Sequence, residues 1–273
     1  MSEFNVNDLK KLYIPKPDSH KGENGKLLII GGSVLFHAAS LWSLQVASRI
    51  VDMVFYSSVP QNNALVEKEK SEFRNGIIVP RNKIDHYIQD ADCVLIGPGL
   101  PRENGIEEGD DDTKELTERL FKAYPSKKWV VDGGSLQVIG PEILPPTAII
   151  TPHHQEFKTL FNLEPTFENA QDMVQKFKIT ILLKGERDIV CDAGNSVKIA
   201  GGNAGMTKGG TGDVLAGLVA ALYCKNDAFL SAEVGSFINK KAGESLEKKM
   251  GIYFNASDLA TEIPVAMKEL LTA

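Results

Sequence analysis

The chain has 273 residues, of which 42% are hydrophobic and 24% are charged, and its formal net charge is −6. This composition is typical of a soluble globular protein that is long enough to bury a sizeable core. The negative net charge argues against nucleic acid or an anionic membrane as a partner, so we expect neither. No apolar run in the sequence approaches the roughly 18 residues that a membrane-spanning helix needs.

The first part of the chain predicts a central strand after a polar start. Residues 1–25 are polar and do not resemble a signal peptide. Residues 26–30 are mostly apolar and end at Gly31-Gly32-Ser33, which is typical of a buried parallel strand. A helix over 38–50 and a strand over 51–56 follow. Residues 60–90 predict only a short strand at 77–79 and one or two helical turns at 83–89.

The middle of the chain alternates strands with glycine turns and helices. Strands are predicted over 93–96, 129–132 and 148–150, and the first two end at Gly97-Pro98-Gly99 and Gly133-Gly134. The acidic run 107–112 is predicted to be a solvated loop whose charges suit the start of a helix over 113–123. Helices over 156–161 and 168–177 precede a strand over 180–184, which ends at Gly185.

The C-terminal part predicts two short strands and three helices. The strands lie at 189–191 and 197–199, and the helices at 214–223, 228–249 and 257–271, with Ser257 as the N-cap of the last. Alternating strands and helices predict an α/β fold, with a mainly parallel sheet flanked by helices on both faces. We find no linker and no repeat, so residues 1–273 are expected to form a single domain. The glycine turns would then share one edge of the sheet.

The three cysteines, Cys93, Cys191 and Cys224, lie far apart in the sequence. Their spacing matches no metal site, and an odd number argues against a disulfide framework. We therefore expect buried free thiols and a cytoplasmic location.

The stretch 201–213 has the strongest functional pattern in the chain. It contains glycine at six positions, ends with Asp213 and leads directly into an apolar helix. A glycine loop at a helix N-terminus presents free N–H groups and partial positive charge, which suit a phosphate. We expect the helix dipole to favour the ionised form of Asp213, which could accept a proton from a substrate hydroxyl. The alternative is that Asp213 is an N-cap at the end of a flexible loop.

Five segments, in order over about 190 residues, support a comparison with known families. They are His20–Ser33, Gly97–Leu100, Thr151–Phe157, Leu183–Asp188 and Asn203–Asp213. Together they resemble the ADP/ATP-dependent NAD(P)H-hydrate dehydratase family of the ribokinase-like superfamily. The combination of T-P-H-x-x-E-F with G-G-T-G-D is the specific part of this resemblance.

The resemblance implies a repair reaction. Such enzymes use ATP or ADP to convert the S-epimer of NADHX or NADPHX back to NADH or NADPH, by phosphorylating the ring hydroxyl and eliminating phosphate. Asp213 would take the hydroxyl proton, and Mg²⁺ would come with the nucleotide without a dedicated carboxylate cage. The implied nucleotide-binding residues are Lys184, Gly185, Glu186, Arg187, Asp188, Gly210, Thr211 and Gly212. The implied substrate-binding residues are Ala39, Gly99, His153, Glu156 and Asp213.

Several alternatives stay open in the sequence. His153 and Glu156 could simply begin a helix, Lys184 could be a solvent-exposed lysine at a strand end, and Asp132 could be a structural cap or could touch the ligand. A vitamin-precursor kinase of the same superfamily, or a non-catalytic nucleotide sensor, would share much of the pattern. The resemblance also suggests a homo-oligomer, possibly a tetramer, and a separate upstream epimerase, since these 273 residues leave no room for one.

Two departures from the family pattern stand out. His154-Gln155 replaces the Pro-Gly that many members have after the histidine, and Phe36-His37-Ala38-Ala39 lacks the usual glycine beside the alanine. The resemblance therefore leaves open which ligand contacts the residues at both positions make.

Overall fold

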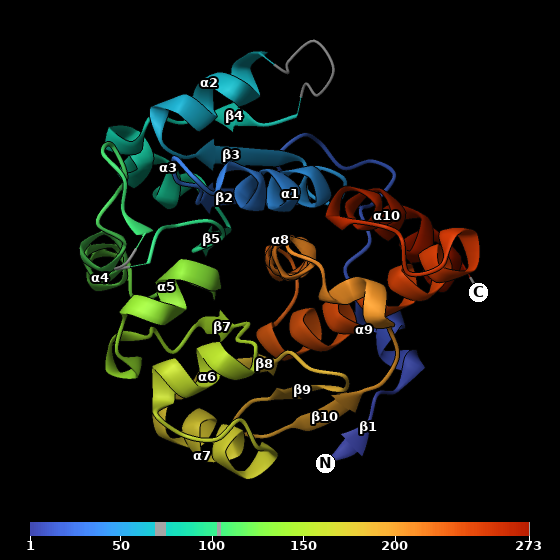
Figure 1. The fold of residues 1–273 in the computed structure, drawn as a ribbon. Coiled ribbons are helices and arrows are strands. Elements are labelled where there is room, and N and C mark those ends of the chain that lie inside the picture. The colour runs from blue at the N-terminus through green and yellow to red at the C-terminus, as the bar shows by residue number, and fades with distance from the viewer. Residues whose placement is uncertain (69–74, 103–104, 273) are drawn as a thin grey trace.

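The computed structural model describes residues 1–68, 75–102 and 105–272. Its centre is a ten-stranded sheet with helices on both faces, as Figure 1 shows. The strands lie side by side in the order β1-β10-β9-β8-β7-β6-β5-β2-β3-β4. The α/β class and the mainly parallel sheet expected from the sequence are therefore confirmed.

Parallel pairing runs from β8 across the sheet to β4. These strands are β2 (Lys26–Ile30), β3 (Met53–Ser57), β4 (Ile77–Ile78), β5 (Cys93–Ile96), β6 (Lys128–Val131), β7 (Ala148–Ile150) and β8 (Thr180–Leu183). An antiparallel hairpin of β9 (Asp188–Cys191) and β10 (Ser196–Ile199) extends the sheet beyond β8, and β1 (Ser2–Glu3) pairs in parallel with β10. The chain starts the parallel part at β2 and later returns to its other side with β5, so the topology reverses between these two strands.

The central strands are buried on both faces, which explains their continuous apolar sequences. In β2, Leu27 and Ile29 point into one hydrophobic core, and Leu28 and Ile30 point into the other. Successive side chains of a strand alternate between faces, so each strand contributes to both cores.

The helices divide between the two faces in the same way (Figure 1). One face is covered by α1 (His37–Ala47), α8 (Thr211–Tyr223), α9 (Ala228–Met250) and α10 (Ala256–Thr272). The other is covered by α3 (Ile84–Asp90), α4 (Thr113–Ala123), α5 (Gly133–Val138), α6 (His154–Phe161) and α7 (Phe167–Phe177). The helix α2 (Pro60–Lys68) lies beside the edge strand β4, and short 3₁₀ helices lie at Val6–Lys11, Arg81–Lys83, Pro141–Ile143 and Ala204–Thr207.

Most predicted elements are present, and the differences have local causes. Neither α2 nor α5 was predicted, and α1 ends at Ala47 rather than at residue 50. The expectation that Ser257 caps the last helix is wrong. The Asn255 side chain accepts the N–H groups of Ser257 and Asp258, while the Ser257 hydroxyl accepts a hydrogen bond from the Trp42 indole. Asn255 therefore caps α10, because its carbonyl oxygen reaches the free amides of the first turn.

The acidic run 107–112 does more than face solvent. Asp112 caps α4 by accepting the N–H of Glu115, as its charge and position favour. Asp111 forms an ion pair with Arg81 at 2.7 Å, and Asp110 accepts the backbone N–H of Val34 at 2.8 Å. The run is a largely exposed loop that leads into α4, as predicted, and two of its carboxylates also tie the loop after β2 and Arg81 to it.

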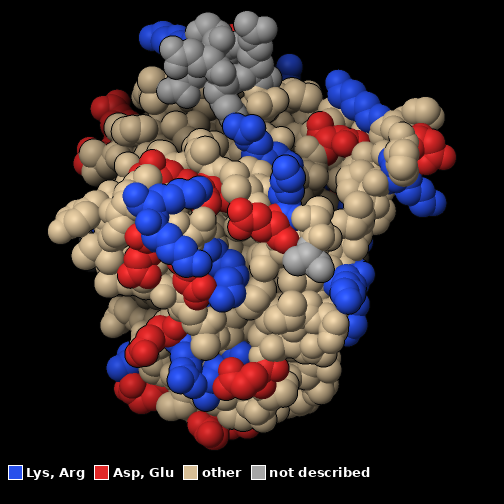
Figure 2. Space-filling model, turned by 90° about the vertical axis from the view of Figure 1, so that its right-hand side faces the viewer, with Lys and Arg blue, Asp and Glu red and all other residues tan. Residues whose placement is uncertain are grey.

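The surface and the thiols fit the composition. The three cysteines are buried and free, as expected. On the face in Figure 2, acidic and basic side chains are interspersed among neutral ones. No helix in the described part of the chain is long and apolar enough to cross a membrane.

Candidate active site

A large cavity lies where the strands of the parallel sheet end. Its volume is about 1040 Å³, at the upper end of the range usual for small-molecule sites. The glycine turns after β5, β6 and β8 all contribute to its wall, as do the 201–212 loop and the start of α8. In open parallel sheets, ligands bind at this edge and where the strand order reverses. The convergence expected from the sequence is therefore confirmed for these turns, whereas the turn at 31–33 lies against Pro98 and does not itself line the cavity.

Glycine is required where the turns pack closely against each other. Gly99 has φ +72°, and a Cβ at this position would lie 2.4 Å from the carbonyl oxygen of Phe36 and 3.0 Å from the Cβ of Ala39. A Cβ on Gly97 would lie 1.7 Å from the carbonyl oxygen of Asp132. No larger residue fits these positions without moving the backbone. The turn after β5 therefore lies directly against Ala39, and both Gly99 and Ala39 line the cavity.

The glycine loop before α8 presents free backbone amides. Gly210 starts the helix with φ +95°, and a Cβ there would lie 2.3 Å from the Trp42 ring. Among the described residues, the N–H groups of Gly209, Gly210 and Gly212 have no hydrogen-bond acceptor. The Thr211 hydroxyl donates hydrogen bonds to the carbonyls of Met206 and Lys208, and these bonds fix the loop. The loop and the positive end of α8 therefore form a cradle suited to an anion.

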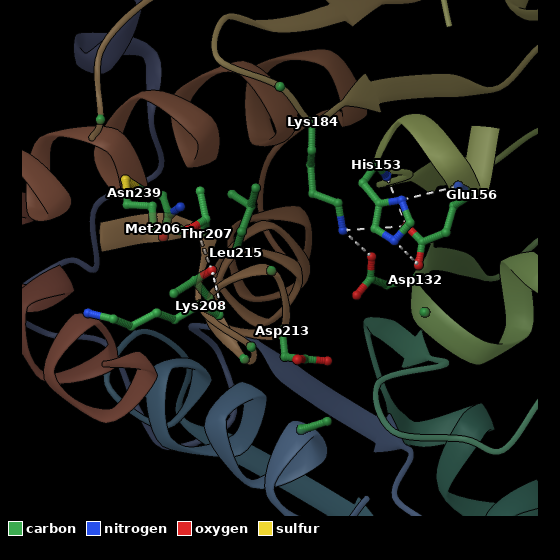
Figure 3. Close-up of a pocket in the computed structure, with 18 of the residues that line it drawn as sticks. Asp132, His153, Glu156, Lys184, Met206, Thr207, Lys208, Asp213, Leu215 and Asn239 are labelled. Atoms are coloured by element: carbon green, nitrogen blue, oxygen red, sulfur yellow. Dashed lines mark hydrogen bonds and ion pairs between the residues drawn. The ribbon is translucent and has the colours of Figure 1, made fainter. Parts of the chain in front are cut away.

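The Lys208 ammonium does not point into this cradle. It donates to the carbonyls of Ile252 and Phe254, and Figure 3 shows its side chain directed away from Asp213. The cradle therefore relies on backbone amides and on a different lysine.

Asp213 lies in the first turn of α8 and lines the cavity. Its backbone carbonyl accepts a hydrogen bond from the Ser43 hydroxyl of α1 at 2.8 Å, which fixes the start of the helix. Burial, together with the negative charges of Asp132 and Glu156, raises the pKa of the Asp213 carboxyl to about 7 against the opposing effect of Lys184. The expected stabilisation of the ionised form at the helix start is present as a backbone hydrogen bond that lowers the pKa, but burial and the carboxylates outweigh it. A carboxyl with this pKa is suited to general-base work near neutral pH.

Lys184 connects the anion cradle with a group of carboxylates. Its ammonium lies 2.9 Å from Asp132 and 3.8 Å from Glu156, and a Cβ on Gly212 would lie 3.3 Å from the same nitrogen. Burial lowers the pKa of Lys184, but these carboxylates outweigh burial and raise it, so the ammonium stays charged. Lys184 is therefore not a solvent-exposed lysine at a strand end.

Asp132 follows β6 and faces the cavity. Its side chain makes no hydrogen bond that caps α5, and it instead accepts from Thr151 at 2.7 Å and from Lys184. The question left open by the sequence is thereby answered in part, because Asp132 is not a cap.

His153 and Glu156 begin α6 and also line the cavity. The imidazole Nδ1 of His153 accepts the N–H of Glu156 at 3.1 Å, and the Glu156 carboxylate accepts the N–H of His153 at 2.9 Å. This capping box requires His153 to be neutral, with its proton on Nε2. Burial and the nearby Lys184 lower the pKa of His153, and burial raises that of Glu156. Both residues combine a helix-start role with a place in the site.

Lys240 of α9 contacts the turn after β8 and fixes its position. The Lys240 ammonium donates to the carbonyls of Gly185, Glu186 and Gly201, and lies 3.4 Å from the Asp188 carboxylate. Gly185, Glu186 and Asp188 line the cavity. Arg187 is exposed and does not line it.

Sequence reasoning missed several residues of the cavity. Met206, Leu215 and Asn239 line its wall opposite His153 and Glu156 in the view of Figure 3, and Lys240 lines the cavity as well. Asn239 and Lys240 lie within a helix of 23 residues that the sequence predicts without showing which side faces the sheet edge. A weak apolar pattern along this helix gives no signal that could have selected them.

Comparison with known proteins identifies the fold and the family of this chain. The fold is ribokinase-like, because it matches a ribokinase-like superfamily protein from Enterococcus faecalis with a TM-score of 0.82 over 98% of this chain and 96% of that chain at 22% identity. It also matches an ADP/ATP-dependent NAD(P)H-hydrate dehydratase from Bacillus subtilis, co-crystallized with ATP/Mg²⁺, with a TM-score of 0.81 over 98% of each chain at 20% identity. The family model described as NAD(P)H-hydrate dehydratase matches residues 27–265. The chain therefore belongs to the NAD(P)H-hydrate dehydratase family, and the resemblance seen in the sequence is confirmed.

Two curated relatives support this assignment. The chain is 34% identical to an ADP-dependent (S)-NAD(P)H-hydrate dehydratase from Nitrosopumilus maritimus, and the match covers 95% of each protein. It is 38% identical to a bifunctional NAD(P)H-hydrate repair enzyme from Methanocaldococcus jannaschii, where the match covers 96% of this chain but 52% of that enzyme. The chain thus spans about half the length of the bifunctional relative.

Proposed function

We propose that this protein uses ATP or ADP to dehydrate the S-epimer of NADHX or NADPHX, restoring NADH or NADPH. The main support is the position of Asp213, a carboxylate of raised pKa beside a cradle of free amides in a cavity of about 1040 Å³. Hydroxide is a poor leaving group and phosphate a good one. A site that brings a nucleotide's terminal phosphate next to a base therefore has what the reaction needs.

In the first step, Asp213 accepts the proton of the ring hydroxyl while the oxygen of that hydroxyl attacks the terminal phosphorus of the nucleotide. A new O–P bond forms, and the bond from that phosphorus to the bridging oxygen breaks, which releases the shortened nucleotide. The amides of Gly209, Gly210 and Gly212 and the Lys184 ammonium lie where they would stabilise the transferring phosphoryl charge. In the second step, the C–O bond breaks, phosphate leaves with the electron pair, and loss of a proton from the neighbouring carbon restores the double bond.

Mg²⁺ is proposed to bind together with the nucleotide. The described residues include no cluster of three or more side chains arranged to hold a metal. However, Mg²⁺ often needs only one or two carboxylates besides phosphate and water, and Asp132 and Asp213 line the cavity. When bound there, the ion would neutralise phosphate charge during transfer.

Two sets of residues around the cavity are proposed to bind two different ligands. Ala39, Gly99, His153 and Glu156 are proposed to bind the hydrate, and the turn at 184–188 with Gly210, Thr211 and Gly212 is proposed to bind the nucleotide. Arg187 could contribute only by changing its direction, because it does not line the cavity. The homo-oligomeric state, the cytoplasmic location and the separate epimerase stay predictions of the sequence.

The proposal is tested by incubating purified protein with the S-epimer of NADHX, Mg²⁺ and either ATP or ADP. Recovery of NADH absorbance, with one phosphate released per NADH formed, is the expected result. Asp213→Asn should abolish recovery while the protein stays folded, because the amide cannot accept the proton. The absence of recovery with both nucleotides would refute the proposal. Nucleotide consumption with a vitamin precursor alone would then favour the kinase alternative.

A further inference from the structure

One cationic side chain of the cavity wall has no partner in the part of the chain that the structure describes. Four described lysines and arginines line the cavity, and they are Arg102, Lys184, Lys208 and Lys240. The three lysines are already engaged, respectively with Asp132, with two backbone carbonyls and with Asp188 (Figure 3 shows the first of these contacts). The Arg102 guanidinium makes no hydrogen bond or ion pair within 1–68, 75–102 and 105–272. Its N–H donors are therefore available to a ligand.

The backbone that leads to Arg102 is held in place. The N–H of Leu100 donates to the carbonyl of Gly97 at 3.0 Å, which closes the turn after β5. The carbonyl of the buried Pro101 accepts the hydroxyl of Thr113, the first residue of α4, at 2.7 Å. Arg102 itself is exposed and lines the cavity. Its side chain therefore extends from an anchored turn, and it can contact a ligand without a change in the backbone.

Arg102 lies near the residues that are proposed to bind the hydrate. Gly99 precedes it by three positions on the same turn and lines the same cavity. Burial is the main cause of the lowered pKa of His153, and the positive charges of Lys184 and Arg102 add to it. Burial raises the pKa of Glu156, and the same two charges oppose that rise. The guanidinium is therefore close enough to the start of α6 to act on both of its first-turn side chains.

The hydrate brings negative charge into a cavity that already holds many carboxylates. Among the described residues, the carboxylates of the wall belong to Asp132, Glu156, Glu186, Asp188 and Asp213. The pyrophosphate of NADHX is negatively charged, and NADPHX carries a further phosphate. The amides before α8 are proposed to hold the phosphates of the nucleotide, so the phosphates of the hydrate need a different partner. A free guanidinium supplies one, because its planar fork matches two phosphate oxygens.

We propose that Arg102 binds the pyrophosphate of the NADHX or NADPHX dinucleotide. The pyrophosphate lies closer to the nicotinamide ring than the 2′-phosphate of NADPHX does, so a guanidinium near His153 meets the pyrophosphate first. Because both hydrates carry this group, Arg102 contributes equally to the binding of both and does not select between them. The inference rests on the proposed function, since it takes the hydrate as the ligand of this part of the cavity.

The test measures the binding of three probes to the full chain by calorimetry, with ADP and Mg²⁺ present to fill the nucleotide site. The probes are NADH, NADPH and reduced nicotinamide riboside, which has the same ring but no phosphate. In Arg102→Met, NADH and NADPH should both bind about tenfold more weakly, and the riboside should change by less than about twofold. Arg102→Lys keeps the charge without the fork, so its loss should be intermediate.

Arg49→Met is the matched control. Arg49 is exposed and does not line the cavity, so this variant makes the same change in net charge without removing the proposed contact. Its affinities for the three probes should stay within about twofold of the unaltered protein. Added KCl should weaken NADH binding to the unaltered protein more than to Arg102→Met, because salt screens a charged contact that the variant lacks. The unliganded melting temperature of Arg102→Met should be unchanged, since the side chain has no partner to lose.

Three outcomes would overturn the inference. They are unchanged NADH affinity in Arg102→Met, an equal loss for the riboside, and a loss confined to NADPH, which would place the contact at the 2′-phosphate. An unaltered protein that binds no NADH would overturn it as well. Because binding requires no turnover, the result is separate from the repair assay. A protein that binds NADH through Arg102 but does not repair NADHX would refute the proposed function alone.

Discussion

Replacing Asp132 by asparagine tests whether Asp213 acts as a base with a pKa near 7. The ionised form of Asp213 is the one that accepts a proton, so activity should be lost as the pH falls through about 7. Asp132 is a negative group that raises the pKa of Asp213, and it also holds Lys184 at 2.9 Å. Asp132→Asn removes that charge and frees the lysine to favour the Asp213 carboxylate. Both effects lower the pKa, so the acidic side of the pH profile should move to lower pH.

The size of the shift follows from the charges in the site. With a pKa of about 7, Asp213 is about one-tenth ionised at pH 6, whereas an unperturbed aspartate would be almost fully ionised there. Removing one nearby like charge shifts a pKa by about one unit. The ionised fraction at pH 6 would then rise to about one half. Relative to its own plateau, the variant should be about fivefold more active than the unaltered protein at pH 6.

The assay is NADH recovery between pH 5.5 and 8.5, with kcat/KM for the nucleotide determined at each pH. ATP itself titrates in this range, but its contribution is the same for every variant and cancels in the comparison. Asp85→Asn is the control, because Asp85 forms an exposed ion pair with Arg119 outside the cavity. An acidic limb that stays in place in Asp132→Asn, or moves to higher pH, would refute the assignment of Asp213 as the titrating base.

Three further predictions follow from individual contacts. Lys184→Met removes the cation that lowers the pKa of Asp213, so the same pH titration should show the limb moving to higher pH. Gly210→Ala should lower the free energy of unfolding, measured in urea, by about 2 kcal/mol or more, because Gly210 has φ +95° and an added Cβ would clash with the Trp42 ring. Gly209→Ala is the control: its Cβ would meet nothing within 4 Å, so the free energy of unfolding should change by less than about 0.5 kcal/mol. Lys240→Met leaves Asp188 buried without its cation and should cost about 3–5 kcal/mol in the same measurement; an unchanged midpoint would contradict the role given to Lys240.

The strands and their glycine turns could be predicted because each is encoded locally. Residues 93–96 are continuously apolar and end at glycine, and the structure has β5 with the same bounds. Once the strands are parallel, their ends must share an edge, so the place of the site follows from the order of elements. The helix at 113–123 was likewise predicted with its observed bounds, since its apolar spacing is strong and acidic residues precede it.

The electrostatics of the site could not be predicted, because they depend on residues far apart in the sequence. Lys184 meets Asp132 across 52 positions, and only the pairing of β6, β7 and β8 brings them together. The sequence suggested that Asp213 would ionise easily, since a helix dipole is visible locally whereas burial and neighbouring carboxylates are not. The orientation of Asn239 was hidden for the same reason, because it depends on how α9 lies against the 203–206 segment.

The helix α1 sets the distance between two parts of the site. Ala39 forms part of the wall where the hydrate is proposed to lie, and Ser43, one turn later, holds the carbonyl of Asp213. A Cβ on Gly217 of α8 would lie 2.7 Å from the Cα of Ser43, so the two helices are in backbone contact. The spacing between the substrate wall and the base is therefore set by one short stretch of regular helix.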